Sequence, residues 1–465
     1  MMESINPATG ETVETYDDHS TEEVDAALDR ATSTYEEWSD TRIETRQQLL
    51  ANVADVLYEN EDRYAELITE EMGKPIAQSH SEVEKCALGC EYYAERADEF
   101  LQDEVLGSDP DTRTLVSYEP LGVVLSIMPW NFPFWQVFRF AAPNITAGNV
   151  GVFKHASNVP GCAMAIQEIF EEAGYPENVF QTLLIGSDQI DDVIADDRVN
   201  AVTLTGSEGA GRAVGESAGK NLKKHVLELG GSDPFIVLDD ADIEAAASTG
   251  AQARTINSGQ SCIAAKRFIV HEEVYDEFLE RFIEEMNSLT IGDPMDEETD
   301  IGPQAREDLL ETLHEQVEDS IEAGATLELG GEPIESEGNY YPPTVLTDIP
   351  EDSPASAEEI FGPAAALFGV ESEAEAIEVA NDHRYGLGAS IWTEDLDRGD
   401  RLAREVESGL AYVNQLVKSD PRVPFGGVKD SGYGRELAHF GIQEFVNKKT
   451  VWIQSPGERD DVATE

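Results

Sequence analysis

The order of apolar and polar positions changes character along the chain. Residues 21–105 repeat apolar side chains at helical spacing, as in Leu49-Leu-Ala-Asn-Val-Ala-Asp-Val-Leu57. Two strands are then predicted, Thr112–Tyr118 and Val123–Ile127, separated by the turn residues Glu119-Pro-Leu-Gly122. A helical N-terminal region therefore leads into a strand-containing region.

From residue 123 to 239, apolar runs alternate with helical segments. The runs lie at 123–127, 150–154, 179–185, 201–205 and 225–229, and helices are predicted at 160–173 and 209–219. Such alternation predicts a parallel, doubly wound α/β sheet. Ligands of these sheets bind beyond the carboxyl ends of the strands. The sequence places Asn131, Lys154, Gly206 and Glu228 there.

A second alternating series predicts a second α/β domain, which carries Cys262. Its apolar runs lie at 234–238, 267–270, 364–368 and 389–392. The tail segment Phe445–Ile453 predicts a strand that follows a helix, and we expect it to pair with another element or another subunit. A length of 465 residues fits about two or three domains.

The charge balance is strongly acidic, with 95 Asp and Glu against 31 Lys and Arg and a net charge of −64. The acids are spread along the chain, which predicts a solvated acidic surface suited to a salt-rich cytoplasm and a halophilic source. In 1 M salt the Debye length falls to about 3 Å, which makes such a charge tolerable. A disordered acidic protein conflicts with the many apolar runs. Nucleic acids and anionic membranes are expected to be poor partners.

No targeting or membrane segment is predicted. The chain has no apolar run of 18 residues, and its start lacks a basic region followed by an apolar one. Four cysteines are too few for a disulfide framework. Both features predict a cytoplasmic protein.

Three of the four cysteines are interpreted as packing residues. Cys86 and Cys90 share one face of a predicted helix, but no second Cys or His pair completes a metal site, so no metal is expected. Cys162 begins an otherwise apolar helix. Cys262 differs because it ends the polar turn Asn257-Ser-Gly-Gln-Ser-Cys262. A thiolate there can attack an aldehyde carbon, although the segment alone fits a buried structural cysteine equally well.

Two further residues suggest acid–base and oxyanion chemistry. Glu228 follows an apolar run and precedes two glycines that would let it swing, so it could serve as a general base. The alternative is an ordinary surface acid, one of 95 acidic residues. Asn131, in Pro129-Trp-Asn-Phe-Pro133, could hold an oxyanion, although a turn-forming asparagine is the common alternative.

A cationic strand end and a glycine-containing turn suggest a nucleotide. Lys154 could meet a phosphate or ribose, or simply face solvent. Thr205-Gly-Ser-Glu-Gly-Ala-Gly211 opens a helix whose backbone amides suit a pyrophosphate. Its glycines do not match the G-x-G-x-x-G fingerprint, and an ordinary helix start explains it equally well.

Taken in order, these segments resemble the aldehyde dehydrogenase superfamily. Each motif is only moderately specific, but seven in register are highly specific. The matching segments are Pro129-Trp-Asn-Phe-Pro133, Lys154, Thr205-Gly-Ser207, Glu228-Leu-Gly-Gly231, Gly259-Gln-Ser-Cys262, Glu359-Ile-Phe-Gly-Pro363 and Pro424-Phe-Gly-Gly427.

The resemblance implies two doubly wound, Rossmann-like α/β domains and a small β oligomerisation arm. The cofactor-binding domain would take residues 1–101 and 121–230, plus a return segment near 431–444. The catalytic domain would take 231–430. The arm would take 102–120 and 445–465. Homodimers or homotetramers are typical of the family.

The resemblance also implies a mechanism. Cys262 would attack the aldehyde to give a thiohemiacetal, whose oxyanion Asn131 and the Cys262 backbone amide would hold. Hydride transfer to a nicotinamide would leave a thioester. Glu228 would then activate water to hydrolyse it.

Cofactor contacts follow from the same resemblance. Trp130 would line the cofactor groove, Lys154 would contact the adenosine ribose, and Gly206 with Ser207 would face the pyrophosphate. Glu359 would bind the nicotinamide ribose and Phe361 would pack nearby; the alternative for this pair is an acidic loop followed by core packing.

One position bears on the choice of dinucleotide. Members of the family that prefer NAD often carry Glu three residues after the lysine, where this chain has Ser157. A serine removes a like charge and can donate to a 2′-phosphate. We therefore expect a preference for NADP, with NAD possible.

The segment Lys154-His-Ala-Ser-Asn-Val-Pro-Gly-Cys162 resembles the succinate-semialdehyde dehydrogenase branch. Arg139 lies eight residues after Asn131, where that branch places a carboxylate-binding arginine, and Ser419 could add a hydrogen bond. The alternative for Arg139 is a helix-surface ion pair. Some members have another arginine six residues before the cysteine, where this chain has Ile256. If Arg139 alone recognises the carboxylate of the substrate, the specificity for aldehydes could be broad.

Three alternatives stay open. The substrate could be another small or sugar-derived semialdehyde. Coenzyme A could resolve the thioester instead of water, although a water-activating Glu228 speaks against this. The chain could also be a non-catalytic binding or structural member of the family, which the presence of Cys262, Glu228 and Asn131 together disfavours.

Overall fold

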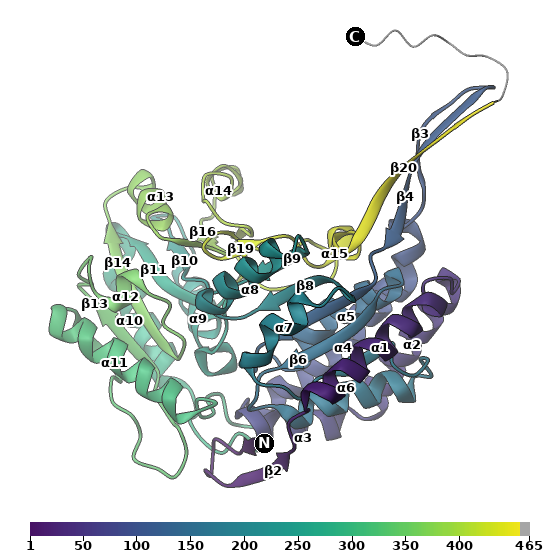
Figure 1. The fold of residues 1–465 in the computed structure, drawn as a ribbon. Coiled ribbons are helices and arrows are strands. Elements are labelled where there is room, and N and C mark those ends of the chain that lie inside the picture. The colour runs from purple at the N-terminus through teal and green to yellow at the C-terminus, as the bar shows by residue number, and fades with distance from the viewer. Residues whose placement is uncertain (456–465) are drawn as a thin grey trace.

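The computed structural model describes residues 1–455 and contains two mainly parallel sheets side by side (Figure 1). The first has the order β19-β9-β8-β5-β6-β7. Its strands are β5 (Val123–Met128), β6 (Val150–His155), β7 (Phe180–Thr182), β8 (Val199–Thr205), β9 (Lys224–Glu228) and β19 (Gly432–Tyr433). All pairs are parallel except that of β19 with β9. The doubly wound sheet expected from the first apolar series is therefore confirmed.

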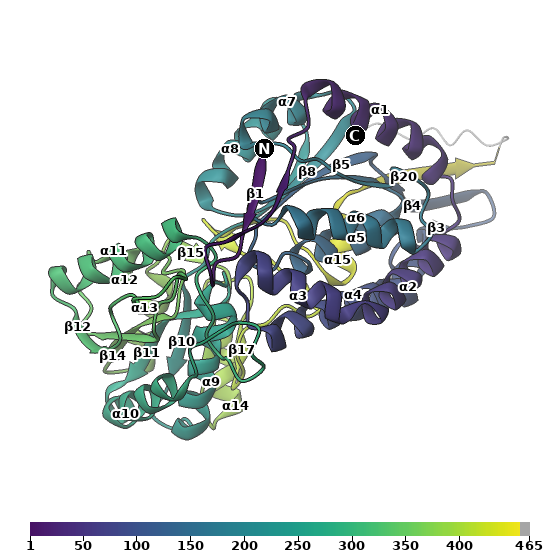
Figure 2. The same cartoon turned by 90° about the horizontal axis from the view of Figure 1, so that it is seen from below.

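Helices cover both faces of this sheet, as Figure 2 shows. On one face lie α1 (Thr21–Trp38), α7 (Ile190–Ala195) and α8 (Glu208–Lys220), and on the other α5 (Trp135–Ala147) and α6 (Pro160–Glu172). An outer layer contains α2 (Ile43–Glu59), α3 (Glu61–Met72) and α4 (Ile76–Phe100). The apolar repeat of α2 is fully buried at Leu50, Val53 and Leu57, which confirms the helical prediction.

The second sheet has the order β12-β13-β14-β11-β10-β16-β17. Its strands are β10 (Asp233–Val237), β11 (Ala265–His271), β12 (Thr326–Leu329), β13 (Thr344–Thr347), β14 (Ala364–Val370), β16 (Ser390–Trp392) and β17 (Tyr412–Val413). Helices α9 (Ile243–Thr255) and α10 (Glu272–Ser288) pack on one face, and α13 (Glu373–Asn381) packs on the other. The sequence pattern predicted four of these strands and missed β12, β13 and β17.

A three-stranded arm projects from the first domain (Figure 1). It consists of β3 (Glu104–Ser108), β4 (Thr112–Pro120) and β20 (Val446–Gln454). Strand β20 pairs antiparallel with the whole of β4, from Val446 opposite Pro120 to Gln454 opposite Thr112. The predicted tail strand is thus confirmed, and its partner is in the same chain. Residues 456–465 of the expected arm lie outside the described residues.

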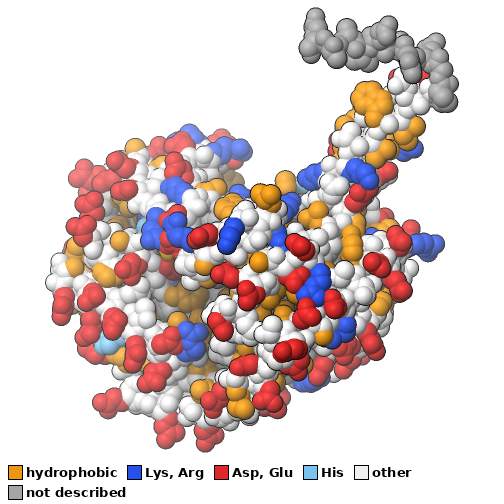
Figure 3. All heavy atoms as spheres, in the orientation of Figure 1, with side chains coloured by type: hydrophobic (Ala, Val, Ile, Leu, Met, Phe, Trp, Pro, Cys, Tyr) orange, Lys and Arg blue, Asp and Glu red, His pale blue; other side chains and the backbone are white. Residues whose placement is uncertain are grey.

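The surface carries acidic side chains over the whole face seen in Figure 3, with basic groups between them. This distribution agrees with the even spread of acids along the sequence. Among the helices of residues 1–455, none combines the length and the apolar character needed to cross a bilayer.

Strand register brings the chemically interesting segments to one edge of the first sheet. Lys154 lies opposite Ile127, which in turn lies opposite Leu204, and Leu204 lies opposite Leu227. The strands run in the same direction, so the residues that follow them meet at their carboxyl ends. The segments that begin at Pro129 and Gly206 therefore start beside Lys154 and Glu228.

A buried carboxylate fixes the start of α5. Glu82, on α4, accepts hydrogen bonds from the backbone N–H groups of Phe134 and Trp135, both at 2.9 Å. It also pairs with Lys74, whose side chain is fully buried and whose pKa burial lowers. The ammonium of Lys74 in turn lies 3.9 Å from the ring centre of Phe132. One ion pair thus positions the segment that carries Asn131.

The Glu82→Gln variant should lose about 3 kcal/mol of unfolding free energy, because it leaves the Lys74 cation buried without its counter-charge. Denaturant unfolding in concentrated KCl, followed by fluorescence, measures the loss. The double variant Lys74→Met with Glu82→Gln should recover most of it, since it removes both charges. An unchanged midpoint in Glu82→Gln would show that the pair does not hold this region together.

Candidate active site

A cavity of about 260 Å³ opens at the carboxyl edge of the first sheet and is lined by residues of both sheet regions. Seven of the residues predicted from the sequence line it: Trp130, Asn131, Gly206, Ser207, Cys262, Glu359 and Phe361. They come from four separate segments of the chain. The fold thus brings together groups that the sequence alone could only place in order.

Cys262 follows a turn with an unusual backbone. Asn257, Ser258 and Gly259 all lie in the left-handed region, with φ of 53°, 54° and 77°. The turn is held by the Asn257 side chain, whose Nδ2 donates to the Asn131 carbonyl at 2.7 Å. Asn131 Nδ2 donates to the Gln260 carbonyl at 3.1 Å. Two hydrogen bonds therefore join the oxyanion candidate to the turn that precedes the nucleophile candidate.

Gly259 has no room for a side chain. A Cβ there would lie 2.2 Å from the carbonyl carbon of Gly362, in the Glu359–Pro363 motif. Its positive φ also disfavours other residues. The glycine therefore lets two distant motifs of the chain come into contact.

Burial dominates the electrostatics of Cys262. It raises the pKa of the thiol to about 12, while the positive charges of Arg139 and Lys266 act in the opposite direction. Lys266 Nζ donates to the carbonyls of Ser261 at 2.9 Å and Cys262 at 2.8 Å. The thiol therefore rests in its protonated form beside two cations that would favour a thiolate.

Cys262 is the partly accessible thiol among the four cysteines, all of which lie within the described residues. Cys86, Cys90 and Cys162 are completely buried, as expected for packing residues. Covalent reagents should therefore reach Cys262 first.

Two N–H donors beside the thiol make no hydrogen bond within residues 1–455. One is the backbone N–H of Cys262, and the other is the second N–H of Asn131 Nδ2, whose first bonds to Gln260. A pair of free donors at a nucleophile is the arrangement that stabilises an oxyanion.

Glu228 ends β9 and is only 2% exposed. Neither of its carboxyl oxygens has a hydrogen-bond partner among the described residues. Burial raises its pKa well above the usual range, and the nearby carboxylate of Glu436 adds to the shift. A Cβ on Gly426 would lie 2.6 Å from Glu228 Oε1, so this glycine of the Pro424–Gly427 motif makes room for the carboxyl group. Glu228 does not line the cavity in this conformation.

The two glycines after Glu228 act differently from the sequence expectation. Neither has a positive φ. A Cβ on Gly230 would lie 2.3 Å from Glu359 Oε2, and one on Gly231 would lie 2.8 Å from the Cys262 carbonyl oxygen. They permit close packing of the Glu359 and Cys262 segments, and the structure gives no sign that they serve as a hinge.

The cavity wall opposite Cys262 has the features of a dinucleotide site. Ser207 caps α8, its Oγ accepting from the Ala210 N–H at 3.4 Å, and Gly206 leaves the helix start open. Helix N-termini favour phosphate groups. Glu359 is held by the Gly231 N–H at 3.1 Å and by Lys266 at 3.5 Å.

Aromatic rings close one side of this wall. The ring of Phe361 meets that of Trp130 edge-on, with centroids 5.8 Å apart. The residues present therefore fit a nicotinamide dinucleotide.

Besides Glu228, four predicted residues do not line this cavity: Lys154, Ser157, Arg139 and Ser419. Lys154 ends β6 half-buried, with its pKa lowered by burial. Ser157 is exposed and lines a neighbouring cavity beside the N-terminal segment. Both lie at the same sheet edge as Trp130, through the pairing of β6 with β5.

Arg139 is buried, with 2% of its surface exposed, which rules out the alternative of a helix-surface ion pair. Its guanidinium pairs with Glu436, donates to Thr205 Oγ1 at 3.3 Å and lies 4.4 Å from the ring centre of Phe425. Its charge is thus already balanced within the protein.

Sequence reasoning missed Lys266 and Glu436. A signal for Lys266 existed, since lysines are scarce in this chain and this one begins an apolar strand four residues after Cys262. Glu436 gave no signal, because it is one acid among 95 and its partner Arg139 is far away in sequence.

Comparison with known proteins places this site in a family. Residues 1–451 match the model of the aldehyde dehydrogenase family. A protein of Synechocystis sp. described as "Probable succinate-semialdehyde dehydrogenase [NADP(+)]" is 53% identical over 450 residues, which cover 97% of this chain and 99% of that one. A succinate-semialdehyde dehydrogenase [NADP(+)] of Mycobacterium avium is 49% identical, with 98% of each chain covered.

The fold agrees. The crystal structure of succinic semialdehyde dehydrogenase from Streptococcus pyogenes, in complex with NADP⁺, has a TM-score of 0.96 and 40% identity. It covers 98% of this chain, and this chain covers 100% of it. The chain belongs to the aldehyde dehydrogenase family, as its motifs indicated.

Alkylation of Cys262 by iodoacetamide should accelerate about tenfold per pH unit between pH 7 and 10, because the reactive thiolate fraction grows with pH below the raised pKa. Mass spectrometry should find one label per chain, and the Cys262→Ser variant should take none. A rate that levels off below pH 9 would contradict a thiol pKa near 12.

Proposed function

We propose that this protein oxidises succinate semialdehyde to succinate with NADP as the preferred cofactor. The observation that carries the proposal is the meeting of Cys262, Asn131 and a dinucleotide-compatible wall in one cavity. The full-length similarity to proteins named as NADP-dependent succinate-semialdehyde dehydrogenases supports the substrate and the cofactor.

In the proposed mechanism, the Cys262 thiol loses its proton to water and Sγ bonds to the aldehyde carbon, whose C=O π electrons move onto the oxygen. The Cys262 backbone N–H and Asn131 Nδ2 donate to the resulting oxyanion. NADP, when bound, supplies the hydride acceptor. Glu228 then takes a proton from the water that attacks the thioester, and the thiol is released. To do so its carboxyl group leaves the buried contact with Gly426, releases its proton to water and turns toward Cys262 as a carboxylate.

Dinucleotide binding is assigned to the wall opposite the thiol. Gly206 and Ser207 would meet the pyrophosphate, Glu359 the nicotinamide ribose, and Trp130 with Phe361 would line the groove. Lys154 would contact the adenosine ribose. Ser157, exposed just beyond Lys154, would donate to the 2′-phosphate.

For the carboxylate end of the substrate, the proposal includes Ser419 and Arg139. Ser419 is 7% exposed, and its Oγ accepts a hydrogen bond from Trp135 Nε1, four residues after Asn131. Arg139 lies close enough to influence the pKa of Cys262, and it would share its guanidinium between Glu436 and the substrate.

The remaining assignments follow the sequence expectations. We propose a cofactor-binding domain of residues 1–101, 121–230 and about 431–444, and a catalytic domain of 231–430. Residues 102–120 and 445–455 would form an arm that joins subunits into a dimer or tetramer. The exposed side chains of Trp452 and Ile453 on β20 offer apolar surface for such a contact. The acidic surface would suit a salt-rich cytoplasm.

The proposed reaction predicts that purified protein in concentrated KCl forms succinate and NADPH in equal amounts from succinate semialdehyde. The kcat/KM should exceed that for butanal by at least tenfold. Glu228→Gln should still release one equivalent of NADPH per chain in a burst and then turn over at least 100-fold more slowly, because thioester hydrolysis loses its base. Formation of an acyl-CoA product, or a full steady-state rate in Glu228→Gln, would refute this mechanism.

Cofactor preference should depend on Ser157. The Ser157→Glu variant should lower kcat/KM for NADP at least tenfold and leave that for NAD within about threefold, because the new carboxylate repels a 2′-phosphate. Ser157→Ala, which removes the donor without adding charge, serves as the matched control and should have a smaller effect. Wild-type kcat/KM for NAD above that for NADP would show that the serine does not select NADP.

A further inference from the structure

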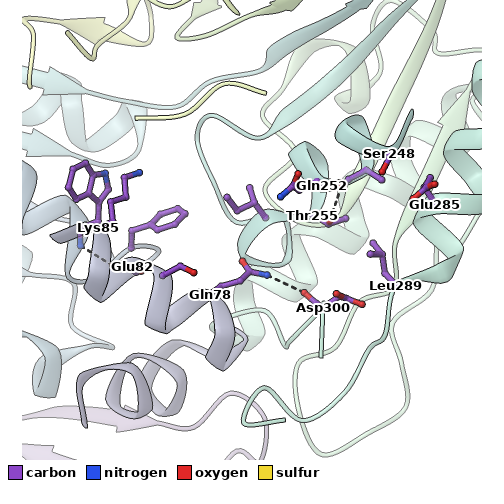
Figure 4. A pocket seen from close by; sticks show the side chains of 14 residues that line it. Gln78, Glu82, Lys85, Ser248, Gln252, Thr255, Glu285, Leu289 and Asp300 are labelled. Carbon is purple, nitrogen blue, oxygen red and sulfur yellow. Dashed lines mark hydrogen bonds between the residues drawn. The ribbon is translucent and has the colours of Figure 1, made fainter. Parts of the chain in front are cut away.

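A second cavity, of about 540 Å³, is shown in Figure 4, and Phe132 and Trp135 from the segment that carries Asn131 help to line it. Asn131 and Gln136 face the cavity of Cys262, whereas their neighbours Phe132 and Trp135 face the second one. Because the proposed dinucleotide would occupy the first cavity, the second offers the aldehyde a separate approach. Helix α4 forms one wall, and α9 and α10 form the opposite one.

Lys85 extends from α4 at one end of this cavity (Figure 4), and it lies beside the indole of Trp135. Its Nζ lies 4.5 Å from the centre of the Trp135 ring and donates to Ser419 Oγ at 2.7 Å. Among residues 1–455, no carboxylate pairs with it. Lys74 and Arg139, by contrast, are each paired with a buried glutamate.

An unpaired ammonium is unexpected in this protein, which has 95 acidic groups against 31 basic ones. A charge removed from water is normally matched by an opposite charge. Lys85 is partly buried, and burial lowers its pKa to about 8, with the charge of Arg139 adding to the shift. The site therefore lacks an anion that would favour the protonated lysine.

Ser419 needs an acceptor as well. A hydroxyl oxygen can accept two hydrogen bonds, and that of Ser419 accepts from Lys85 Nζ at 2.7 Å and from Trp135 Nε1 at 2.8 Å. Its own O–H is left to donate, and the described residues provide no acceptor for it. An ammonium and a hydroxyl donor thus lie side by side without an anion.

We propose that Lys85, together with Ser419, binds the carboxylate of the aldehyde substrate. This assignment rests on the proposed function and makes it more specific. Ile256 lines the same cavity and brings no charge, and the charge of Arg139 is balanced by Glu436. Lys85 is therefore the cation that gives the site its preference for an aldehyde that ends in a carboxylate.

Other charged groups surround Lys85. Arg139 on α5 and Lys74 before α4 disfavour its protonated form, whereas Glu82 and Cys86 on α4 favour it. Glu285 and Asp300 line the same cavity. When two aldehydes are compared at each pH, the titration of groups that both reactions require cancels from the ratio of their kcat/KM values.

The test measures kcat/KM for succinate semialdehyde and for butanal in concentrated KCl, and takes their ratio. Lys85→Met should lower the ratio at least tenfold at pH 7, mainly by raising KM for succinate semialdehyde, and should leave butanal within twofold. Lys85→Arg, which keeps the charge, should restore the ratio to within about threefold. Lys220→Met, which removes an exposed lysine at the end of α8, serves as the matched control and should match the wild type.

The wild-type ratio should also fall about tenfold between pH 7 and 9, as Lys85 loses its proton around pH 8. In Lys85→Arg it should stay constant, because arginine remains charged. A ratio that Lys85→Met leaves unchanged, or equal losses on both aldehydes, would overturn the assignment of Lys85 while the proposed function stands. A wild-type enzyme without preference for succinate semialdehyde would refute the proposed function itself.

Discussion

The left-handed turn before Cys262 is the constraint on which the rest of the site depends. A non-glycine residue in this conformation costs on the order of 1–2 kcal/mol, and Asn257 and Ser258 both adopt it. The turn persists because its polar groups are held from several directions: Asn257 bonds to Asn131, and the Gly302 N–H donates to Ser258 Oγ at 2.9 Å. The bonds that offset the strain also set the position of Asn131 relative to Cys262. The same hydrogen bonds therefore offset the backbone strain, connect the two sheet regions and preorganise the oxyanion donors.

Burial then decides the resting charges of the site. It raises the pKa of both Cys262 and Glu228, so the nucleophile and the base of the proposed reaction wait in neutral forms. Neutral groups avoid the desolvation cost of buried ions. The basic groups nearby each have local partners: Arg139 pairs with Glu436, and Lys266 pairs with Glu359 and donates to backbone carbonyls. The Cys262 thiol would thus ionise only when bound ligands change the burial or the charges around it.

The sequence predicted what depends on local pattern and missed what depends on distant contacts. The strands of the first sheet were recognisable because apolar runs such as 150–154 are bounded by turn residues and helices. The short β17 and β19 have two residues each and carry no periodic signal.

The motif segments were found because their residue types are unusual. The contact of Glu228 with Gly426 and the bond between Lys85 and Ser419, which spans 334 positions, had no local trace. Arg139 shows the limit most clearly, since its register indicated a substrate contact while folding gave it a buried partner in Glu436.

The segment from Pro129 to Gln136 acts as a partition between two anionic ligands in the proposed reaction. Asn131 and Gln136 face a dinucleotide-compatible cavity on one side, and Phe132 and Trp135 face the cavity of Lys85 on the other. A chain with a net charge of −64 repels both ligands at long range, and salt weakens this repulsion because the Debye length shrinks. Short-range recognition is less affected, since Lys154 and Lys85 are partly shielded from solvent. Lys85 lines the second cavity, and Lys154 lies at the sheet edge near the first. Salt would therefore affect the encounter of ligands with the protein more than their binding geometry.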